Sequence, residues 1–358
     1  MSSTKNVLNV GLSLMVNPHA WLLSDLDKVP KNNLKVMSTF ACGGGSSMGY
    51  KRAGFDVIAA NDIDPEMAYH YKLNLKPKHY YLCTIRDLLT AELPDELFQL
   101  DILDGSPPCS TFSMAGSREK AWGKNKKFRE GQATQVLSDL FFDYLDLVER
   151  LKPRVAIAEN VKGMILGNAK GYTKMVMARF KEIGYRPQLF LVNAADCGVP
   201  QKRERVFFCA IRDDIEALPL VLKPKHRWIS AGEATGDVQV LTSGEKKDSV
   251  VSGIYADYWA KTLPGVVAEN GKGKHGIFYG VRLSGKSPSR SFSASGADKF
   301  MHWAECRQLT YREWKRLGSF PDDYQAKTDK IGKYMIGMSV PPKMTEQVAR
   351  AVHKQWLS

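Results

Sequence analysis

The chain of 358 residues is 44% hydrophobic and 25% charged, which is ordinary for a globular protein that buries a substantial core. Its 51 lysines and arginines exceed its 38 aspartates and glutamates by 13, and this excess favours a polyanionic partner such as nucleic acid. The six cysteines form no CxxC pair and no apolar run approaches about 20 residues, which argues against a zinc module, a disulfide-rich secreted domain and a membrane span.

The N-terminal stretch KNVLNVGLSLMV is weakly similar to a signal peptide. Asn6, Asn9 and Asn17 interrupt its apolar pattern, and no small-residue cleavage site follows. We therefore expect residues 1–33 to be an N-terminal extension that lies on the main domain, and the cysteines to be reduced thiols of a cytoplasmic protein.

Short apolar runs alternate with helical patterns through residues 34–212, which predicts βαβ units and a mostly parallel sheet. The strand candidates are residues 34–40, 55–62, 100–105, 154–161, 186–194 and 205–212. The clearest predicted helix covers residues 135–151, with an apolar face at helical spacing made by Leu137, Leu140, Phe141, Tyr144, Leu145, Val148 and Leu151.

Residues 213–306 interrupt this rhythm, because they are rich in Gly, Ser and Lys and show no clear alternation of helices and strands. We interpret them as an inserted domain. Residues 307–358 complete the first domain: Thr310 and Glu313 predict a capping box, and a last helix begins after Pro341 and Pro342. Apolar side chains recur every fourth residue in that helix, at Met344, Val348, Val352 and Trp356.

A glycine-rich stretch, STFACGGGSSMG at 38–49, follows the first predicted strand and precedes a helix. Its glycines let backbone N–H groups approach a ligand at a helix N-terminus, but the GxGxxG pattern of nicotinamide sites is not met. Asp62, in ANDID at the end of the second strand, is placed to accept the hydroxyls of a ribose. A tight turn with a solvated acid is an equally good interpretation of these two features alone.

Three further motifs are expected at the carboxyl edge of the sheet, where open α/β sheets bind their ligands. In GSPPCSTFSMAG at 105–116, Pro107 and Pro108 stiffen the chain before Cys109, which is either a nucleophile or an inert thiol. AENVKG at 158–163 brings Glu159 to the same edge, where it can share a proton with a substrate nitrogen or simply be solvated.

The third motif is DCGVPQKRERVFF at 196–208, which places Gln201, Arg203 and Arg205 at alternate positions. These positions lie on one face of a strand. Three long polar side chains there suit an anion or a carbonyl oxygen, and the alternative is an edge strand protected by charge.

Taken together, the five motifs resemble the DNA (cytosine-5) methyltransferases in order and spacing. The resemblance runs from residue 34 to near the C-terminus, apart from 213–306, and extends to RQLTYREWKRLGSFPDDY at 307–324 and IGMSVPP at 336–342. It implies an α/β, Rossmann-like class I methyltransferase fold that uses S-adenosylmethionine and releases S-adenosylhomocysteine. It also implies that residues 34–212 form the catalytic domain, that 213–306 form a target-recognition domain, and that 307–358 complete the catalytic domain.

The resemblance also implies a chemistry, in which a cytosine is flipped out of duplex DNA and Cys109 adds to its carbon 6. Glu159 would bind N3 and the exocyclic amine, and Arg205 with Arg203 would hold the O2 side of the base. The expected cofactor contacts are Phe40, Ala41, Gly43, Gly44, Gly45, Asp62, Ile63, Thr84, Ile85, Ser106, Pro108 and Ser339. The expected substrate contacts are Ser110, Phe112, Ser113 and Gln201, and no metal is expected.

Three positions depart from the family's usual pattern. Cys42 replaces the first glycine of the loop, Thr84 replaces an acid near the adenine, and Met338 replaces the asparagine of a Gly-Asn-Ser-Val motif. We expect the change at Met338 to be tolerated, with Ser339 keeping the local backbone contact.

DNA contact is expected from basic segments outside the catalytic residues. The loop at 116–131 has six Lys or Arg and two Glu and is expected to cover the extruded base. Residues 213–306 are nearly neutral, with twelve basic and eleven acidic residues, so the basic excess lies elsewhere. Segments 223–227 and 271–276 are candidate phosphate contacts or plain surface loops.

The sequence favours a monomeric, cytoplasmic, nucleoid-associated enzyme that modifies double-stranded DNA in a restriction-modification or phage system, with a cognate endonuclease as a possible partner. Two alternatives stay open at this point. One is a tRNA cytosine-5 methyltransferase on the same scaffold, although its Cys-Phe-Thr signature is not found. The other is a DNA-binding homologue with weak catalysis.

Overall fold

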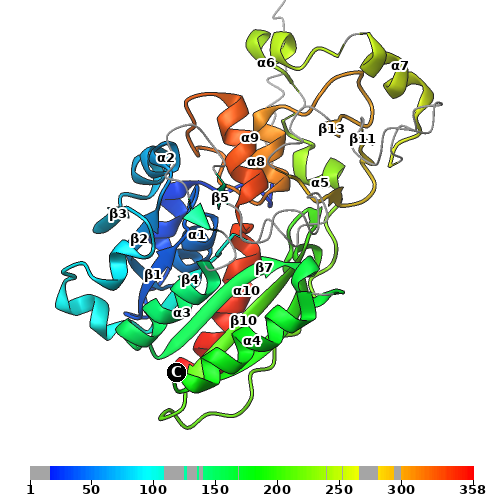
Figure 1. Ribbon diagram of the computed structural model, residues 1–358. Coiled ribbons are helices and arrows are strands. Elements are labelled where there is room, and N and C mark those ends of the chain that lie inside the picture. The colour runs from blue at the N-terminus through cyan, green and yellow to red at the C-terminus, as the bar shows by residue number, and fades with distance from the viewer. Residues whose placement is uncertain are drawn as a thin grey trace, which may run out of the picture.

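A seven-stranded sheet is the framework of the protein in a computed structural model (Figure 1). The structure describes residues 17–108, 125–126, 135–136, 140–167, 169–238, 240–251, 253–265, 281–293 and 300–358. Among these residues, no helix has the length and apolar character needed to cross a membrane.

The sheet has the strand order β3-β2-β1-β4-β7-β10-β8. Its strands are β1 (Lys35–Thr39), β2 (Asp56–Asp62), β3 (His79–Leu82), β4 (Ile102–Gly105), β7 (Val155–Val161), β8 (Tyr185–Asn193) and β10 (Glu204–Arg212). All neighbouring pairs are parallel except those of β10, which is antiparallel to both β7 and β8. The predicted α/β fold with a mostly parallel sheet is thereby confirmed, and all six predicted strands are present. β3 was not predicted, because its four residues are only partly buried.

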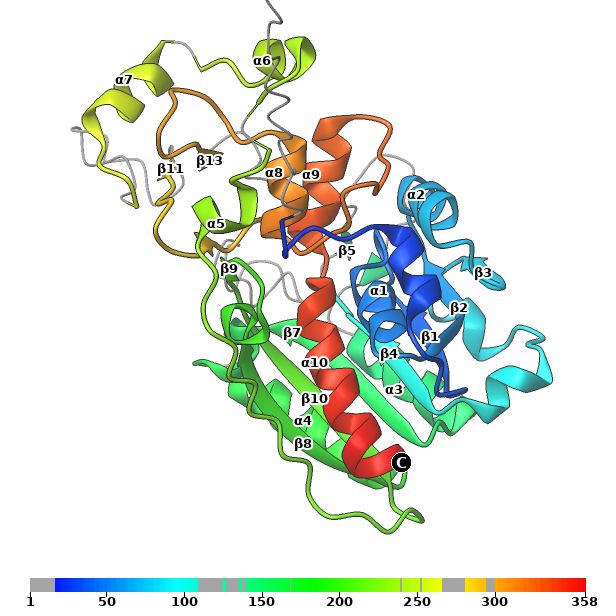
Figure 2. The same cartoon turned by 180° about the vertical axis from the view of Figure 1, so that it is seen from behind.

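Helices cover both faces of this sheet, as Figures 1 and 2 show from opposite sides. On one face lie α1 (Gly45–Arg52) and α10 (Pro342–Val352), and on the other lie α3 (Leu140–Leu151) and α4 (Ala169–Glu182). Alternate residues of each strand feed the two cores: Val36 and Ile102 face α1 and α10, whereas Met37 and Leu103 face α3 and α4. α2 (Pro65–Leu75) links β2 to β3.

The predicted helix at 135–151 is wrong at its N-terminal end. α3 begins at Leu140 within the described residues, and Gln135–Val136 form a strand, β6, antiparallel to β5 (Asn125–Lys126). Leu137 lies outside the described residues. The apolar spacing from Leu140 onward is confirmed, since Tyr144, Val148 and Leu151 are all buried. Helical periodicity in the sequence does not reveal that the first residues of the pattern pair with a strand from another part of the chain.

A second lobe stands above the sheet in Figure 1 and carries most of residues 213–306. Its elements are α5 (Ala231–Thr235), α6 (Ser243–Asp248), α7 (Ile254–Lys261), β11 (Val281–Arg282), β12 (Ser289–Arg290) and β13 (Phe300–Met301). These elements are short and local caps start two of the helices, through the side chains of Ser230 and Thr242. Short elements of this kind escape an analysis of hydrophobic periodicity.

The C-terminal segment joins the two lobes through α8 (Tyr311–Leu317) and α9 (Asp329–Met338). The predicted capping box is confirmed, because the Thr310 hydroxyl accepts from the Glu313 amide while the Glu313 side chain accepts from the Thr310 amide. α10 begins at Pro342 as predicted, and a turn of π-helix (His353–Leu357) continues it. The remaining pieces are β9 (Gln201–Lys202) and the short helices η1 (Leu23–Lys28), η2 (Asp87–Leu89), η3 (Asp95–Gln99), η4 (Lys162–Ile165) and η5 (Ala194–Cys197).

Candidate active site

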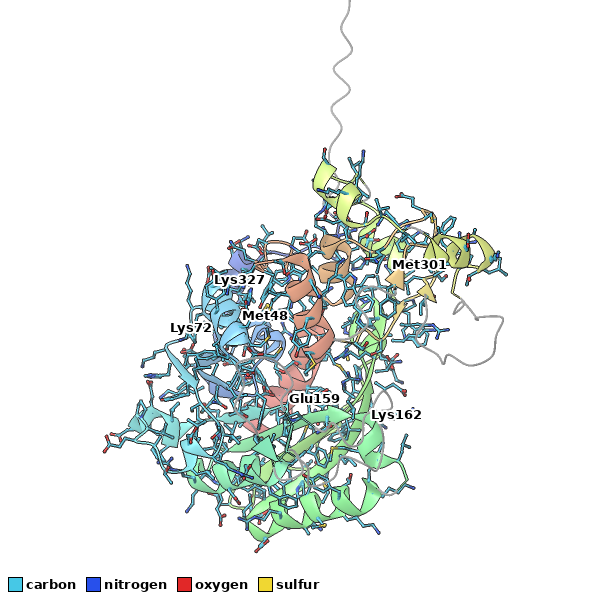
Figure 3. The ribbon with its side chains drawn as sticks, turned by 45° about the horizontal axis from the view of Figure 1, so that its top comes forward. Met48, Lys72, Glu159, Lys162, Met301 and Lys327 are labelled. Atoms are coloured by element: carbon cyan, nitrogen blue, oxygen red, sulfur yellow. The ribbon has the colours of Figure 1, made fainter. Side chains whose placement is uncertain are left out.

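The carboxyl ends of β1, β2, β4 and β7 meet at one edge of the sheet, below the second lobe. Glu159, near the end of β7, lies there in the middle of the molecule, and Met301 marks the second lobe above it (Figure 3). This edge is where parallel strands deliver residues from distant parts of the chain to one place.

Glu159 and Arg205 form a buried ion pair at this edge. Arg205 Nε lies 2.9 Å from Glu159 Oε1, and the Glu159 residue is 8% exposed. The antiparallel register of β10 against β7 sets this contact, since Arg205 is opposite Val161 and Phe207 is opposite Glu159. Burial lowers the pKa of Arg205, and the neighbouring carboxylate opposes that shift. The pair presents a fixed carboxylate and a fixed cation to the edge of the sheet.

Asn160 connects this pair to the strand end that precedes Cys109. Its Nδ2 donates to the Pro107 carbonyl at 2.9 Å, so the ends of β4 and β7 are tied together. Ser106 and Pro108 are both half-buried in the same segment. Cys109, Ser110, Phe112 and Ser113 lie outside the described residues, as does most of the basic loop at 116–131. The sequence analysis assigned no role to Asn160, although its position directly after Glu159 at the end of a predicted strand could have indicated one.

Gln201 and Arg203 do not share the setting of Arg205. Arg203 is 2% exposed, and its guanidinium donates to the carbonyls of Phe292 at 2.7 Å and Gly337 at 3.0 Å. The Gln201 amide donates weakly to the Leu317 carbonyl at 3.4 Å and accepts from the Phe292 amide at 3.3 Å. The interpretation of three side chains on one ligand-binding face therefore needs correction. Arg205 faces Glu159, whereas the other two hold the second lobe and the end of α9 in place.

The glycine-rich turn after β1 is stabilised by Asp62. Cys42 N donates to Asp62 Oδ2 at 2.7 Å, and Asp64 N donates to Oδ1 at 2.9 Å. The chain turns here through two residues with left-handed backbones, Phe40 at φ 52° and Cys42 at φ 46°. A cysteine is therefore strained where glycine would be free. Burial raises the pKa of Asp62 to about 6 and that of the Cys42 thiol to about 12.

The glycines of this turn are required by packing within the protein. A Cβ at Gly44 would come within 2.2 Å of a Leu75 methyl group, and a Cβ at Gly45 within 2.2 Å of the Val340 carbonyl oxygen. The Gly43 carbonyl accepts from the Tyr324 hydroxyl at 2.7 Å. Their contact with a cofactor stays a prediction, as does that of Ala41, which is buried and pairs with the end of β2 through its amide.

The other predicted cofactor residues occupy varied settings. Phe40 and Ile63 are half-buried, whereas Ile85 is 2% exposed and belongs to the core beneath them. The Thr84 hydroxyl accepts from the Asp87 amide at 3.2 Å, so it closes a local turn. Ser339 Oγ is buried next to the Cys42 thiol and has no nitrogen or oxygen partner among the described residues, and Met338 beside it is 44% exposed.

Asp104, in β4, is a buried acid that sequence reasoning missed. It is 2% exposed and accepts from the hydroxyls of Ser38 at 2.8 Å and Tyr50 at 3.1 Å. These contacts join β4 to β1 and α1, directly beneath the glycine-rich turn. Burial raises the pKa of Asp104 to about 7. An aspartate inside the apolar run ILDG is the signal that could have revealed it.

These residues fit S-adenosylmethionine at the β1–β2 end of the edge. The Asp62 carboxylate suits two ribose hydroxyls, and the unsatisfied Ser339 hydroxyl is a polar group in need of a partner. The β4–β7 end, with Glu159 and Arg205, suits a flat heterocycle that carries both a donor edge and an acceptor. The arrangement can therefore place a methyl donor beside a polarised ring.

Comparisons with known proteins identify relatives of this chain. The sequence profile described as C-5 cytosine-specific DNA methylase matches residues 34–354. The chain is 28% identical to Type II methyltransferase M1.HphI of Haemophilus parahaemolyticus over 90% of this chain and 87% of that protein. It is 27% identical to Type II methyltransferase M.NgoPII of Neisseria gonorrhoeae over 90% of this chain and 96% of that protein.

Solved structures share the fold. A prophage-encoded E. coli protein, described as a DNA modification methyltransferase, matches with a TM-score of 0.71 and 20% identity, over 90% of this chain and 99% of that chain. DNMT2 of Spodoptera frugiperda matches with a TM-score of 0.61 and 18% identity, over 89% of this chain and 99% of that chain.

Proposed function

Because the chain belongs to the C-5 cytosine-specific DNA methylase family, we propose that it transfers a methyl group from S-adenosylmethionine to carbon 5 of a cytosine in double-stranded DNA. The single observation that carries this proposal is the buried contact between Glu159 and Arg205 at the carboxyl edge of the sheet. It provides a hydrogen-bonding carboxylate and a cation at fixed positions, which is what a cytosine ring needs in order to be activated.

Cys109 starts the reaction in this proposal. Its thiolate adds to carbon 6 of the cytosine, which breaks the aromaticity of the ring and turns carbon 5 into a nucleophile. Glu159 shares a proton with N3, which takes up the electron pair as the thiolate adds, and it accepts a hydrogen bond from the exocyclic amine. Arg205 orients Glu159 and neutralises charge that develops on the ring. When bound, S-adenosylmethionine supplies a sulfonium methyl group that carbon 5 takes up. Transfer of the carbon 5 proton to solvent, with elimination of the Cys109 thiolate, then restores the ring, and S-adenosylhomocysteine is the other product.

The cofactor and the base occupy neighbouring parts of the edge. Asp62 holds the ribose, while Phe40 flanks the adenine and Ser339 contributes its hydroxyl. Ser106 and Pro108 line the passage between the two ends, and Ser110, Phe112 and Ser113 contact the substrate. The target cytosine leaves the stack to reach Cys109, at a cost of a few kcal/mol.

Residues 213–306 supply target recognition, and the loop at 116–131 covers the extruded base. Relatives named Type II methyltransferases support a role in restriction-modification or in phage modification of DNA. Such an enzyme works as a monomer on DNA in the cytoplasm, beside a cognate endonuclease where the system has one.

Two linked experiments test this function. The full chain is expressed in a host without DNA cytosine methylation, and bisulfite sequencing of the host DNA identifies the methylated cytosine and its context. A duplex that carries 5-fluorocytosine at that position is then incubated with the enzyme and S-adenosylmethionine. We expect a denaturation-resistant adduct with the wild type and none with Cys109→Ser.

Transfer of radiolabelled methyl groups to plasmid DNA and to tRNA separates the remaining possibilities. We expect incorporation into plasmid DNA. Incorporation into tRNA alone would assign the chain to the tRNA methyltransferases. Tight DNA binding without incorporation or adduct would assign it to the catalytically weak DNA-binding homologues.

A further inference from the structure

Two basic side chains lie side by side between the active site and the second lobe. β9 pairs with β12 in parallel, with Gln201 opposite Ser289 and Lys202 opposite Arg290. Gln201 and Ser289 are both buried, at 1% exposure, whereas Lys202 and Arg290 are both exposed. The register therefore places Lys202 and Arg290 next to each other on the exposed face of the two-stranded β9–β12 sheet.

Like charges at directly opposed positions of neighbouring strands repel each other. Among the described residues, no carboxylate forms an ion pair with Lys202 or Arg290. Lys202 Nζ instead lies 5.0 Å from the centroid of the Trp228 ring, and within the described part of the chain Arg290 donates a weak hydrogen bond to the Gly265 carbonyl at 3.4 Å. A pair of uncompensated cations held together by backbone pairing is an arrangement that an anion would stabilise.

A cavity opens at this pair. It has a volume of about 290 Å³, and both Lys202 and Arg290 line it. Ser284, Ser287 and Gly265 also line it, and the rest of the wall is apolar, formed by Val281, Leu283 and Pro288. Two cations and two serines in the wall of an otherwise apolar pocket are groups that suit a phosphate.

The position of the pocket suggests which phosphate it takes. Lys202 lies three residues before Arg205, so the backbones of the two residues are at most about 10 Å apart. Successive phosphates of one strand of B-DNA rise by about 3.4 Å along the helix axis. Measured along the DNA axis, the pocket therefore lies at most about three nucleotides from a base that contacts Arg205.

We propose that Lys202 and Arg290 form a phosphate-binding pocket that grips the DNA backbone of the target strand close to the extruded cytosine. This inference rests on the proposed function. It assigns a ligand to a pocket outside the catalytic residues, because the phosphate is held by the β9–β12 pair and not by Glu159 or Arg205. A grip there would keep the backbone fixed while the nucleotide rotates out of the stack.

The test measures binding of the full chain to its target duplex in the presence of S-adenosylhomocysteine at increasing salt. The variant Lys202→Ala/Arg290→Ala is expected to reduce the slope of log affinity against log salt by about 1, with equal weakening on target and unrelated duplexes. Lys202→Arg/Arg290→Lys keeps both charges and should retain the wild-type slope. Lys174→Ala, which removes an exposed lysine of α4, controls for loss of surface charge in general.

Position is tested with duplexes that carry one uncharged methylphosphonate at successive sites on either side of the target cytosine. The wild type should lose affinity at one or two sites within three nucleotides, and the double alanine variant should show no further loss at those sites. Unchanged far-ultraviolet circular dichroism and unfolding temperature would show that the variant is folded.

Two results would overturn the pocket while leaving the proposed function intact. In one, the double alanine variant has the same salt slope as Lys174→Ala. In the other, it stays as sensitive as the wild type to every methylphosphonate. A wild-type enzyme that neither binds nor methylates DNA would instead remove the proposed function, and the pocket with it.

Discussion

Arg205 Nε lies 2.9 Å from Glu159 Oε1, although the two residues are 46 positions apart in the chain (205 − 159). The pairing of β10 with β7 imposes it, because the two side chains are diagonal neighbours across an antiparallel register. The two residues therefore act as one unit, and removing either partner leaves the other as an uncompensated buried charge.

Glu159→Gln and Arg205→Ala should each lower kcat by about 10²–10³ with little change in cofactor affinity, as expected for groups that act on the ring in the transition state. The double variant should lose no more than the worse single variant, because residues that act as a unit are non-additive. Single-turnover transfer of radiolabelled methyl groups measures this. Losses that multiply would show that the two residues act independently.

Lys162→Ala is the matched control for that pair. Lys162 follows the last residue of β7, and its Nζ contacts Oε2 of Glu204, the first residue of β10, at 2.8 Å, but both side chains are more than one-third exposed. An exposed ion pair contributes little, so kcat at saturating DNA should stay within about twofold of the wild type.

Arg203→Ala should destabilise the fold by about 2–4 kcal/mol, because the carbonyls of Phe292 and Gly337 would lose their donor inside the protein. Chemical denaturation measures this loss. The affinity for S-adenosylhomocysteine should also fall, since Gly337 precedes Met338 and Ser339. A variant of wild-type stability with lost catalysis would instead make Arg203 a catalytic residue.

Binding of S-adenosylhomocysteine should weaken as the pH falls below about 6, because burial raises the pKa of Asp62 to about 6 and the ribose requires the ionised carboxylate. The loss should approach tenfold per pH unit below that value. Calorimetric titration between pH 5 and pH 8 measures it. Asp62→Asn should bind weakly with no such slope, and Asp104→Asn should retain the slope.

Asp104→Asn should gain stability relative to the wild type as the pH rises. Burial raises the folded-state pKa of Asp104 to about 7 from an ordinary value of 3.8, so the folded state holds the proton more tightly. The stabilisation that this proton gives is complete below about pH 4 and is lost as the pH rises through 7. Between pH 5 and pH 8 the difference in unfolding free energy should shift by about 2–3 kcal/mol in favour of Asn. A constant difference would show that Asp104 is ionised in the folded protein throughout this range.

The wild type with Met338 should transfer methyl groups, and Met338→Asn should change kcat by less than about threefold. The side chain of Met338 is 44% exposed, and the backbone beside it is held by Arg203 through the Gly337 carbonyl. That support does not depend on the side chain at 338. An inactive wild type restored by Met338→Asn would contradict this expectation.

Hydrophobic runs predicted the framework of the protein because the central strands β1, β2, β4, β7 and β10 are buried on both faces, which makes their sequences almost continuously apolar. The runs ending at Thr39, Asp62, Gly105 and Val161 all end at one edge of the sheet, as the parallel arrangement requires. This is why the sequence alone is enough to place Asp62 and Glu159 at a common edge. Local rules also sufficed for the capping box at Thr310 and for the start of α10.

Alternation alone could not separate Arg203 from Arg205, since both occupy equivalent positions in QKRER. Arg203 is turned into the protein by carbonyls that lie 89 and 134 residues further along the chain, whereas Arg205 meets a carboxylate on the neighbouring strand. The sequence by itself determined the strands, the edge at which they end and the types of side chain near that edge. It could do so because a hydrophobic run and the direction of the chain can be recognised within a few consecutive residues. Only the tertiary structure decided which of those side chains face the site, because hydrogen-bond partners from distant segments compete for each of them.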